Sequence, residues 1–510
     1  MSSKRTPTHP YWATQFRKAG TELRKIAGRY YLYEVHSVYD PLKKGSKKIS
    51  GPILGSITEE KGFVESSKRK LKEQLSHLSG SISGKGIGKI VIKEYGFYCF
   101  LQQHCVDMLA ALKKYFPSLW KQILVMAYDR LVFHSTIRNM DYHYQRSFLS
   151  EAHQVDLGEK TARYHLRDIG RARTNATRYM KSFIKAGDHV LIDATNIYSY
   201  SNNINYVKKG YTKDKTYNTQ FCLLYLYSSS LKLPVFYRLF DGDIKDVSMV
   251  ALAIKESSLQ EVLIVGDKGF FSEDNIGAIQ KAGLTYVIPL HRNSTKIDYG
   301  WMDDPEVKGG NYFKHEGRYI LYWSRPNTGE DNSLSFGKGK TTRYRKIILY
   351  LDESLRQKES DDYRDHMVTH PSKYNLDGYQ KKKMVFGTFT MQVDLKEDLS
   401  APEIYAIYKS RGSIETMFDG LKNIVDVDST YMQNPEALQG WIFINHVAIQ
   451  WYYKLYMLMK NAVMLKHNSV SDIIMKLKDV RKVKINGQWL PEQVNDRTVS
   501  LLRGIGIDVT

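Results

Sequence analysis

The sequence predicts a mixed α/β protein, in which a sheet-forming core carries a β-rich insertion and follows two N-terminal regions, one with strands and one helical. Three observations lead to this fold class. Short apolar runs alternate with helical patterns between residues 187 and 290, strand-like runs return between 294 and 399, and apolar residues recur at helical spacing from 66 to 184. This order of elements predicts a mixed sheet with helices packed on it.

The composition excludes several classes of protein. The 510 residues include 75 Lys and Arg against 54 Asp and Glu, giving a formal net charge of +21, and 42% are hydrophobic. With a mean hydropathy of −0.44, these values exclude a disordered or a membrane protein. Three cysteines, none in a CxxC pair, exclude a disulfide scaffold. No apolar run follows the basic N-terminus, so we expect no signal peptide and a cytoplasmic location.

Positive charge is concentrated near the N-terminus. Residues 1–90 carry 18 Lys and Arg against 7 Asp and Glu, with tyrosines and a tryptophan among them, and RYYLYEVHSVY (29–39) has the alternation of a strand. Cations pair with phosphates and aromatic rings stack on bases, so this composition is typical of a module that binds nucleic acid. The alternative is the solvated face of an ordinary basic protein.

The predicted core consists of five strands and two helices. The first three strands are followed by a helix, a strand, a helix with Ser272 as its N-cap, and a last strand. In chain order the segments are HVLID (189–193), QFCLLYLYSSS (220–230), PVFYRLFDG (234–242), VSMVALAIKES (247–257), EVLIVGD (261–267), SEDNIGAIQKAG (272–283) and TYVIPL (285–290).

Two aspartates end strands of this core. Asp193 ends the first strand and Asp267 ends the fourth, 74 residues later. In open α/β sheets the functional crevice lies at the carboxyl ends of the strands, so both carboxylates are expected at one edge. The alternative for either residue is an ordinary turn former or helix cap.

A helix after Ser400 supplies further polar side chains. Ser400 opens a capping box, and Tyr408, Arg411, Glu415 and Lys422 then recur at helical spacing, within about 60° of one another at about 100° per residue. One acid, two cations and a phenol therefore share a face. The alternative is a solvent-exposed face on which Arg411 and Glu415 form an i,i+4 ion pair.

Three separated carboxylates of this kind suit two magnesium or manganese ions, which prefer oxygen ligands. Such ions activate a water or a 3′-hydroxyl and stabilise the leaving oxygen during displacement at phosphorus. Arg411 and Lys422 would then bind phosphate oxygens, and Tyr408 would donate a hydrogen bond to one.

The segment YKSRGSIETMFDGLK (408–422) resembles the YREK signature of bacterial insertion-sequence transposases of the DDE class and matches it at all four positions. DATNIYSYS (193–201) and GDKGFFS (266–272) are similar to the two aspartate motifs of that family, and the β-rich insertion stands between the second Asp and the Glu, as it does there. The resemblance implies a ribonuclease H-like catalytic core, a dimeric synaptic complex, and cut-and-paste movement through a DNA hairpin.

The resemblance also implies roles for individual residues. Asp193, Asp267 and Glu415 become the catalytic, metal-binding triad, and Tyr408, Arg411 and Lys422 bind DNA phosphates. In the family an aromatic residue of the insertion receives a flipped base. The candidates for the flipped base or another DNA contact are Trp323, Trp301 and Arg292, with core packing as the alternative for Trp323.

The expected function is therefore that of a DNA transposase, which binds terminal inverted repeats, cuts both strands and joins the 3′ ends to target DNA. It would act as a homodimer in a prokaryotic cytoplasm, associated with the nucleoid, with magnesium (or manganese in its place) as cofactor. No phosphate-binding loop motif is complete, so no nucleotide cofactor is expected. The alternatives are a catalytically inactive DNA-binding derivative and a stand-alone metal-dependent nuclease.

The expected domain boundaries follow from these patterns. A basic N-terminal DNA-binding module precedes a helical region, the catalytic core is interrupted by the insertion, and the C-terminal tail is a candidate for dimerisation. In that order, the ranges are 1–80, 81–180, 181–293 with 400–465, 294–399 for the insertion, and 466–510.

Overall fold

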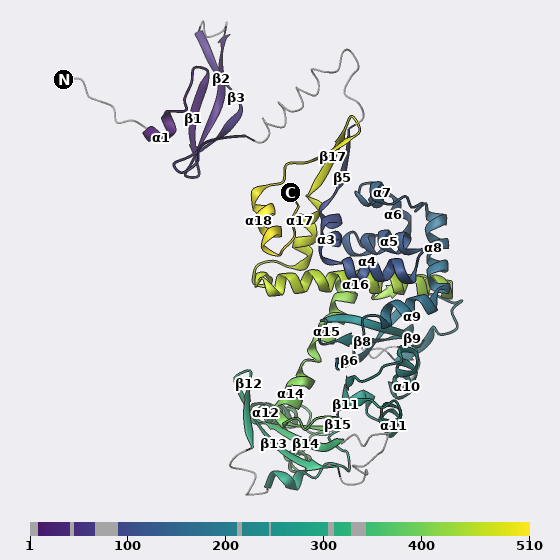
Figure 1. Ribbon diagram of the computed structural model, residues 1–510. Helices are drawn as coiled ribbons and strands as arrows, with labels where there is room; N and C mark the ends of the chain where they lie inside the picture. The colour runs from purple at the N-terminus through teal and green to yellow at the C-terminus, as the bar shows by residue number, and fades with distance from the viewer. Residues whose placement is uncertain are drawn as a thin grey trace, which may run out of the picture. The chain divides into compact units, whose positions relative to one another are not determined.

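The computed structural model describes residues 9–40, 45–66, 90–211, 217–243, 246–303, 311–327 and 343–509 (Figure 1). They form two compact units: the described residues up to Lys93 with Asp479–Ser500, and Glu94–Lys478 with Leu501–Val509. The part of the predicted helical region between residues 67 and 89 lies outside the described residues. Within the described ranges, none of the helices has the length and apolar character needed to span a bilayer.

The first unit contains an antiparallel four-stranded sheet in the order β1-β2-β3-β4. The strand predicted at residues 29–39 is confirmed as β2, and a short helix, α1, packs on the sheet through Ala13. A second sheet has the order β18-β17-β5. The elements are α1 (Tyr11–Thr14), β1 (Thr21–Ile26), β2 (Arg29–Asp40), β3 (Gly45–Thr58), β4 (Gly62–Glu65), β5 (Val91–Glu94), β17 (Arg481–Ile485) and β18 (Gln488–Pro491).

The second unit begins with a helical layer, as its apolar spacing predicts. Its helices include α3 (Gly96–His104), α4 (Val106–Tyr115), α5 (Trp120–Val132), η1 (Ile137–Asn139), α6 (Met140–Tyr144), α7 (Leu149–Ala152), α8 (Glu159–Arg171) and α9 (Arg173–Lys181). Late elements of the chain are α16 (Pro435–Asn461), η5 (Met464–Lys466), α17 (Val470–Lys478) and α18 (Asp496–Gly504).

The long helix α16 runs beneath the helical layer and packs against α5 and α8 (Figure 1). Two glycines permit the contact with α8. A Cβ atom added at Gly170 would lie 1.8 Å from the Glu436 carbonyl oxygen, and one added at Gly440 would lie 2.0 Å from the Leu166 carbonyl oxygen. The two helix backbones are therefore in direct contact, which holds α8 firmly in place.

A sheet of 11 strands forms the centre of this unit, in the order β12-β13-β14-β15-β11-β10-β6-β8-β7, with β16 paired to β6 and β9 paired to β8. β10 is parallel to both β6 and β11, whereas β8 is antiparallel to β6. The mixed α/β prediction is confirmed. The core elements are β6 (His189–Ser199), β7 (Lys208–Tyr211), β8 (Tyr217–Ser228), β9 (Leu233–Asp241), α10 (Asp246–Ser257), β10 (Leu263–Val265), η2 (Lys268–Phe270), α11 (Glu273–Lys281), β11 (Thr285–Pro289) and β16 (Ser429–Thr430).

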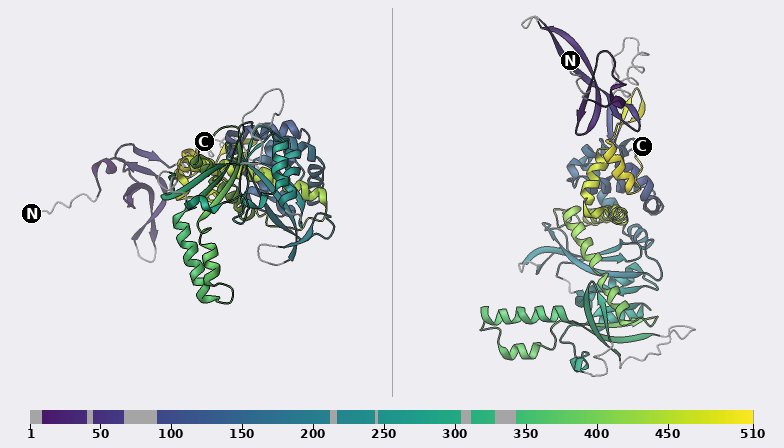
Figure 2. Two further views of the ribbon diagram at one scale, coloured as in Figure 1. Left: turned by 90° about the horizontal axis from the view of Figure 1, so that it is seen from below. Right: turned by 90° about the vertical axis from the view of Figure 1, so that its left-hand side faces the viewer.

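The segment predicted as a β-rich insertion extends the same sheet, because β15 pairs antiparallel with β11. It also contains two helices, α12 and α13, which project together from the sheet (Figure 2). The polar stretch 359–375 contributes most of its residues to α12. The elements are η3 (Tyr299–Asp303), β12 (Tyr312–His315), β13 (Arg318–Pro326), β14 (Tyr344–Asp352), α12 (Glu353–Thr369), α13 (Leu376–Lys382) and β15 (Thr388–Leu395).

Candidate active site

Two adjacent strands bring the predicted aspartates to the same level. β6 and β10 are parallel with Leu191 opposite Val265, so Asp193 and Asp267 each lie two residues further along, on chains about 4.8 Å apart. β10 ends at Val265, and the Asp267 carboxylate then accepts a hydrogen bond from the Lys268 N–H at 2.7 Å. The prediction that Asp193 ends its strand is wrong, because β8 continues to pair with β6 beyond it.

The helix predicted after residue 400 is divided into three segments. They are α14 (Ala401–Lys409), α15 (Gly412–Asp419) and a π-helical turn, η4 (Gly420–Ile424). The capping box at Ser400 is confirmed, since its side chain accepts a hydrogen bond from the N–H three residues on. Arg411 lies at the junction of the first two segments, so the predicted face is assembled from separate helical pieces.

The Arg411 guanidinium lies between two carboxylates. Its Nη1 is 3.1 Å from Asp193 Oδ2, and its other terminal nitrogen forms an ion pair with Glu415. The side chains of Arg411 and Asp193 are 13% and 20% exposed, whereas that of Glu415 is 57% exposed. The i,i+4 pair predicted as an alternative is therefore present, but the same guanidinium also binds an acid that is 218 positions earlier in the chain.

The pKa values reflect an excess of acid around this cation. Burial raises the pKa of Asp193, the Arg411 guanidinium opposes this rise, and the Asp267 and Glu415 carboxylates add to it. Burial lowers the pKa of Arg411, but the surrounding carboxylates outweigh that effect, so its pKa is raised. Burial raises the pKa of Tyr408 to about 12, with Arg411 opposing the rise. One cation thus interacts with three acids.

Lys422 lies further along β6. Its Nζ donates a hydrogen bond to the Asn196 carbonyl oxygen at 3.2 Å and lies 3.2 Å from Asp428 Oδ1. Asn196 is three residues beyond Asp193, a rise of about 10 Å along a strand. The structure therefore brings Tyr408, Arg411, Glu415 and the two aspartates together, and it holds Lys422 at a neighbouring position on the same strand.

The donor set suits a hard divalent cation, because carboxylate oxygens are the ligands that magnesium and manganese prefer. A guanidinium already lies between Asp193 and Glu415. In the part of the chain that the structure describes, no three His, Cys, Asp or Glu side chains stand close enough to hold a metal ion in this conformation. Binding of a metal ion would require Arg411 to move aside and the exposed Glu415 carboxylate to turn inward.

A pocket of about 600 Å³ opens beside Asp267. Aromatic lining residues are Tyr350, Phe389, Tyr405 and Tyr408, and basic ones are Lys268, His291, Arg292, Arg318 and Lys409. Glu359 and Asp352 also line the pocket and pair with Arg292 and Arg318. The other basic side chains, beside aromatic rings that can stack on a base, suit a nucleotide. The sequence analysis named Asp267, Tyr408 and Arg292 but missed the rest of this pocket, since its residues come from seven separate helices and strands. Lys268 is marked locally, by its position directly after Asp267.

The remaining predicted DNA contacts have protein partners. Trp323 is 3% exposed and packs with Met302, so a base could stack on it only if this cluster opened. Trp301 is partly buried against the same cluster, with the Arg325 guanidinium 5.9 Å from its ring. The Arg292 guanidinium binds both carboxylate oxygens of Glu359 at 3.0 Å and the Thr388 carbonyl oxygen at 3.0 Å.

Comparisons with known proteins assign the core to a family. No curated protein matches the sequence. Among solved structures, the chain is similar to the piggyBac transposase synaptic complex with hairpin DNA, at 11% identity and a TM-score of 0.39, over 75% of this chain and 79% of that one. The family model described as the transposase DDE domain matches residues 185–451, which contain Asp193, Asp267 and Glu415. Because that match spans more than half of the sequence, the chain belongs to the family of transposases with a DDE domain.

Proposed function

We propose that the chain is an active DNA transposase of the bacterial insertion-sequence type with the YREK signature. It binds the terminal inverted repeats of its element, cleaves them and joins the 3′ ends to target DNA. The observation that carries the proposal is the Arg411 guanidinium bound to the Asp193 and Glu415 carboxylates, with Asp267 level with Asp193 after the neighbouring strand. A mixed sheet with β6 between parallel β10 and antiparallel β8 is consistent with a ribonuclease H-like core.

Asp193, Asp267 and Glu415 would hold magnesium, or manganese in its place. When bound, two such ions activate the attacking oxygen and stabilise the leaving one. In cleavage, a water oxygen attacks phosphorus, the bond from phosphorus to the 3′ oxygen breaks, and a 3′-hydroxyl and a 5′-phosphate result. In joining, that 3′-hydroxyl attacks a target phosphodiester and the 3′ oxygen of the target leaves. Cleavage consumes water and turns one phosphodiester into a phosphate monoester, whereas joining exchanges one phosphodiester for another, so neither step needs ATP.

The basic residues of the site would position the DNA. Once Arg411 leaves Asp193, its planar guanidinium can bind two oxygens of one phosphate. Tyr408 remains protonated at neutral pH, because its pKa is about 12, and can donate a hydrogen bond. Lys422, 25% exposed, would bind a phosphate further along β6. The pocket beside Asp267 would receive a nucleotide next to the scissile bond.

Further parts of the proposal concern partners and domains. A homodimer would pair two element ends in a synaptic complex, and the basic module of residues 1–80 would recognise them. The helical region (81–180), the core (181–293 and 400–465), the insertion (294–399) and the tail (466–510) would complete the chain. A hairpin intermediate would use an aromatic residue to hold a flipped base; Trp301, being less buried than Trp323, is the better of the two candidates.

Strand transfer separates this proposal from its alternatives. The purified protein is incubated with Mg²⁺, a labelled terminal-repeat duplex already cut at its 3′ end, and a circular target. A transposase joins the labelled end to the circle, whereas a stand-alone nuclease only shortens it and an inactive derivative only binds it. Absence of joined product at saturating DNA occupancy would reject the proposed function.

A further inference from the structure

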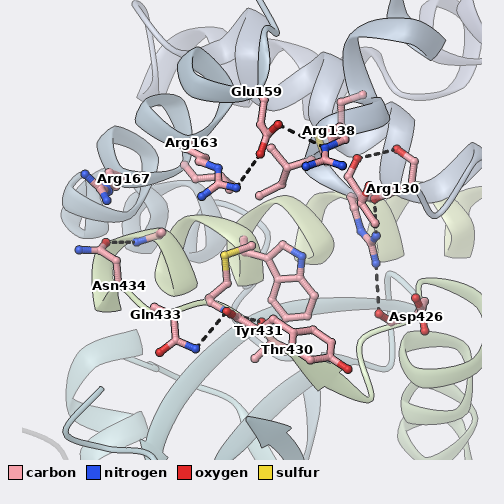
Figure 3. Close-up of a pocket in the computed structure, with 18 of the residues that line it drawn as sticks. Arg130, Arg138, Glu159, Arg163, Arg167, Asp426, Thr430, Tyr431, Gln433 and Asn434 are labelled. Carbon is pink, nitrogen blue, oxygen red and sulfur yellow. Dashed lines mark hydrogen bonds and ion pairs between the residues drawn. The ribbon is translucent and has the colours of Figure 1, made fainter. Parts of the chain in front are cut away.

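A second pocket of the large unit lies away from the three acids. It has a volume of about 640 Å³ and opens between α8 and η1 on one side and the segment from Ser429 to the start of α16 on the other (Figure 3). Arg138, Arg163 and Arg167 line the first wall, and Tyr431 lines the second. None of these residues takes part in the proposed catalytic site.

The first wall carries unbalanced positive charge. Arg138 and Arg163 share one carboxylate, that of Glu159, at 3.4 Å and 2.7 Å, and their side chains are 79% and 62% exposed. Among the described residues, Arg167 forms no hydrogen bond or ion pair with another side chain. Of the acids nearby, Glu159 pairs directly with Arg138 and Arg163, Glu436 attracts Arg167 only through space, and Asp426 lines the pocket beside Arg130. The first wall therefore carries more guanidinium charge than its one paired carboxylate balances. The fourth arginine of the pocket, Arg130, is buried and donates to main-chain carbonyl oxygens, so its role is structural.

The helix that carries two of these arginines is fixed in place. Arg163 and Arg167 are one turn apart on α8, so both side chains point toward the same side of the helix (Figure 3). The close backbone contact of Gly170 and Gly440 fixes this helix against α16. An anion entering the pocket therefore meets two cations on a backbone that need not rearrange, so that only side chains are ordered on binding.

The second wall presents exposed aromatic surface. The rings of Tyr200 and Tyr431 stack with centroids 4.5 Å apart and an interplanar angle of 9°, although these residues are 56% and 74% exposed. The Gln433 side-chain amide donates to the Tyr200 carbonyl oxygen at 3.0 Å and holds the two segments together. Each ring buries one face against the other, so a flat outer face remains available to a further ring.

We propose that this pocket binds a single strand of DNA, with backbone phosphates on Arg138, Arg163 and Arg167 and an unpaired base stacked on the Tyr200–Tyr431 pair. Phosphate and base are the two groups that this combination of guanidinium cations and an exposed aromatic pair recognises. The proposal rests on the proposed function for the choice of DNA, and it adds a strand-binding site outside the catalytic carboxylates.

β6 sets the spacing between the two sites. Tyr200 directly follows this strand and lies seven residues beyond Asp193, which is about 23 Å at about 3.3 Å per residue. That length corresponds to about seven nucleotides of a strand that keeps the spacing it has in a duplex, about 3.4 Å each. A strand whose scissile phosphate lies at Asp193 would therefore place a base about seven nucleotides away on the tyrosine pair.

The test measures binding of a fluorescent single-stranded oligonucleotide by the full-length protein, without Mg²⁺, across a range of salt concentrations. Arg163→Gln combined with Arg167→Gln should lower the slope of log K against log salt by about 1.4, because each phosphate contact of a single strand contributes about 0.7. Arg178→Gln, which removes an exposed cation from α9 of the same unit, should lower it much less. Equal slopes for the double variant and wild type would overturn the proposal.

The aromatic wall is tested separately. Tyr431→Ser should weaken binding of a duplex with a single-stranded extension about tenfold and leave a blunt duplex unaffected, whereas Tyr431→Phe should bind like wild type. Tyr319→Ser, at another exposed tyrosine pair of this unit, is the matched control. A Phe variant as weak as the Ser variant would contradict stacking. If millimolar inorganic phosphate displaced the DNA and Tyr431→Ser had no effect on DNA binding, the pocket would bind anions in general. That result would overturn the proposal.

Crosslinking gives a readout that does not depend on affinity. Oligonucleotides with 5-iodouracil at successive positions should crosslink to Tyr431 about seven nucleotides from the cleavage position, and crosslinking elsewhere on the chain would contradict the assignment. A protein that crosslinks here but joins no DNA ends would retain this inference while the proposed function fails. A protein that joins DNA ends but does not crosslink here would support the proposed function and contradict this inference.

Discussion

Two arginine–aspartate clusters on the same sheet differ in their charge balance. In the first, Arg343 directly before β14 and Arg345 on β14 bind Asp394 on β15. Their Nε atoms lie 2.7 Å and 3.1 Å from the two oxygens of Asp394, and the three side chains are 12%, 2% and 0% exposed. At the candidate active site the ratio is reversed, with one arginine for three acids, one of them largely exposed. The first cluster has two guanidinium groups for one carboxylate, whereas the second has three carboxylates for one guanidinium.

This difference in burial and charge balance distinguishes ion pairs that stabilise the fold from charged groups that can bind a ligand. In the buried cluster both guanidinium groups depend on the one Asp394 carboxylate, because removing it would leave two cations in the interior without a counter-charge, which is very unfavourable. A partly exposed cluster tolerates surplus charge, since water solvates it, and that surplus attracts an ion of opposite sign. The acids around Arg411 therefore suit a metal cation, and the arginines around Glu159 suit an anion.

The largest effect on folding is expected at the buried cluster. Asp394→Asn leaves two buried guanidinium groups without a counter-charge and should lower the free energy of unfolding by about 3–5 kcal/mol. Urea denaturation followed by circular dichroism measures the change. Glu415→Gln, which also removes one carboxylate from an arginine, is the matched control and should cost under about 1 kcal/mol, because that carboxylate is exposed. If both variants lost the same free energy of unfolding, the two clusters would not differ in their contribution to stability.

Gly440 and Gly412 differ in how close other protein atoms lie to the position of an added Cβ atom. Gly440→Ala forces a Cβ against the Leu166 carbonyl oxygen and should destabilise the protein by about 3 kcal/mol. Gly412→Ala should stabilise α15 by up to about 1 kcal/mol, because no atom lies within 4 Å of the added Cβ. Among the described residues no protein atom crowds Gly412, so a glycine at this place on the polar face leaves room for DNA to approach the helix.

Thermal denaturation and DNA binding of the two alanine variants decide this point together. If DNA approaches Gly412, its alanine variant is more stable than wild type and binds terminal-repeat DNA more weakly. Unchanged DNA binding by a stabilised Gly412→Ala protein would reject the close approach of DNA.

Arg411→Ala tests the competition between its guanidinium and a metal ion. Its removal exposes three acids to one another, so Mn²⁺ should bind more tightly to the variant without DNA, by a few-fold, while DNA binding weakens. Isothermal titration calorimetry measures both affinities. Arg411→Lys keeps the charge but not the planar fork and should give an intermediate Mn²⁺ affinity. Weaker Mn²⁺ binding by the alanine variant would mean that Arg411 supports the metal site instead of occupying it.

The smallest expected effect on stability concerns His446, a buried histidine. Burial, with Arg173 nearby, lowers the pKa of His446 to about 3 from an ordinary value of 6.5. The unfolded chain therefore binds a proton below pH 6.5 that the folded protein does not, and stability falls as the pH drops from 6.5 toward 3. His446→Phe should reduce the stability lost between pH 7 and 5.5 by about 1 kcal/mol. An unchanged pH dependence would place a charged partner beside the imidazole.

The order of the elements was predictable from the sequence, but their extent was not. Apolar runs in the sequence locate β6, β8, β9, β10 and β11, because a buried strand needs consecutive apolar residues. The continuation of β6 past Asp193 depends on pairing with β8, and the division of the helix at Arg411 depends on a guanidinium that reaches β6. Neither is encoded in a local pattern.

The candidate site shows the same division. Helical spacing places Tyr408, Arg411 and Glu415 near one another even though the helix is broken, since the junction keeps the turn nearly helical. Both pockets escaped the sequence analysis because their walls come from distant segments. For the pocket between α8 and η1 the available signal was the four-residue spacing of Arg163 and Arg167.

The most direct test of the central claim is cleavage of a labelled terminal-repeat duplex by Asp193→Asn, Asp267→Asn and Glu415→Gln, each compared with wild type at equal DNA occupancy in Mg²⁺. Each variant should fold and bind DNA but lose cleavage by a factor of about 1,000 or more, and a double variant should lose no more than a single one, because residues that act as a unit fail as a unit. Near wild-type cleavage by any of the three would remove that residue from the site, and near wild-type cleavage by Glu415→Gln would contradict the mechanism.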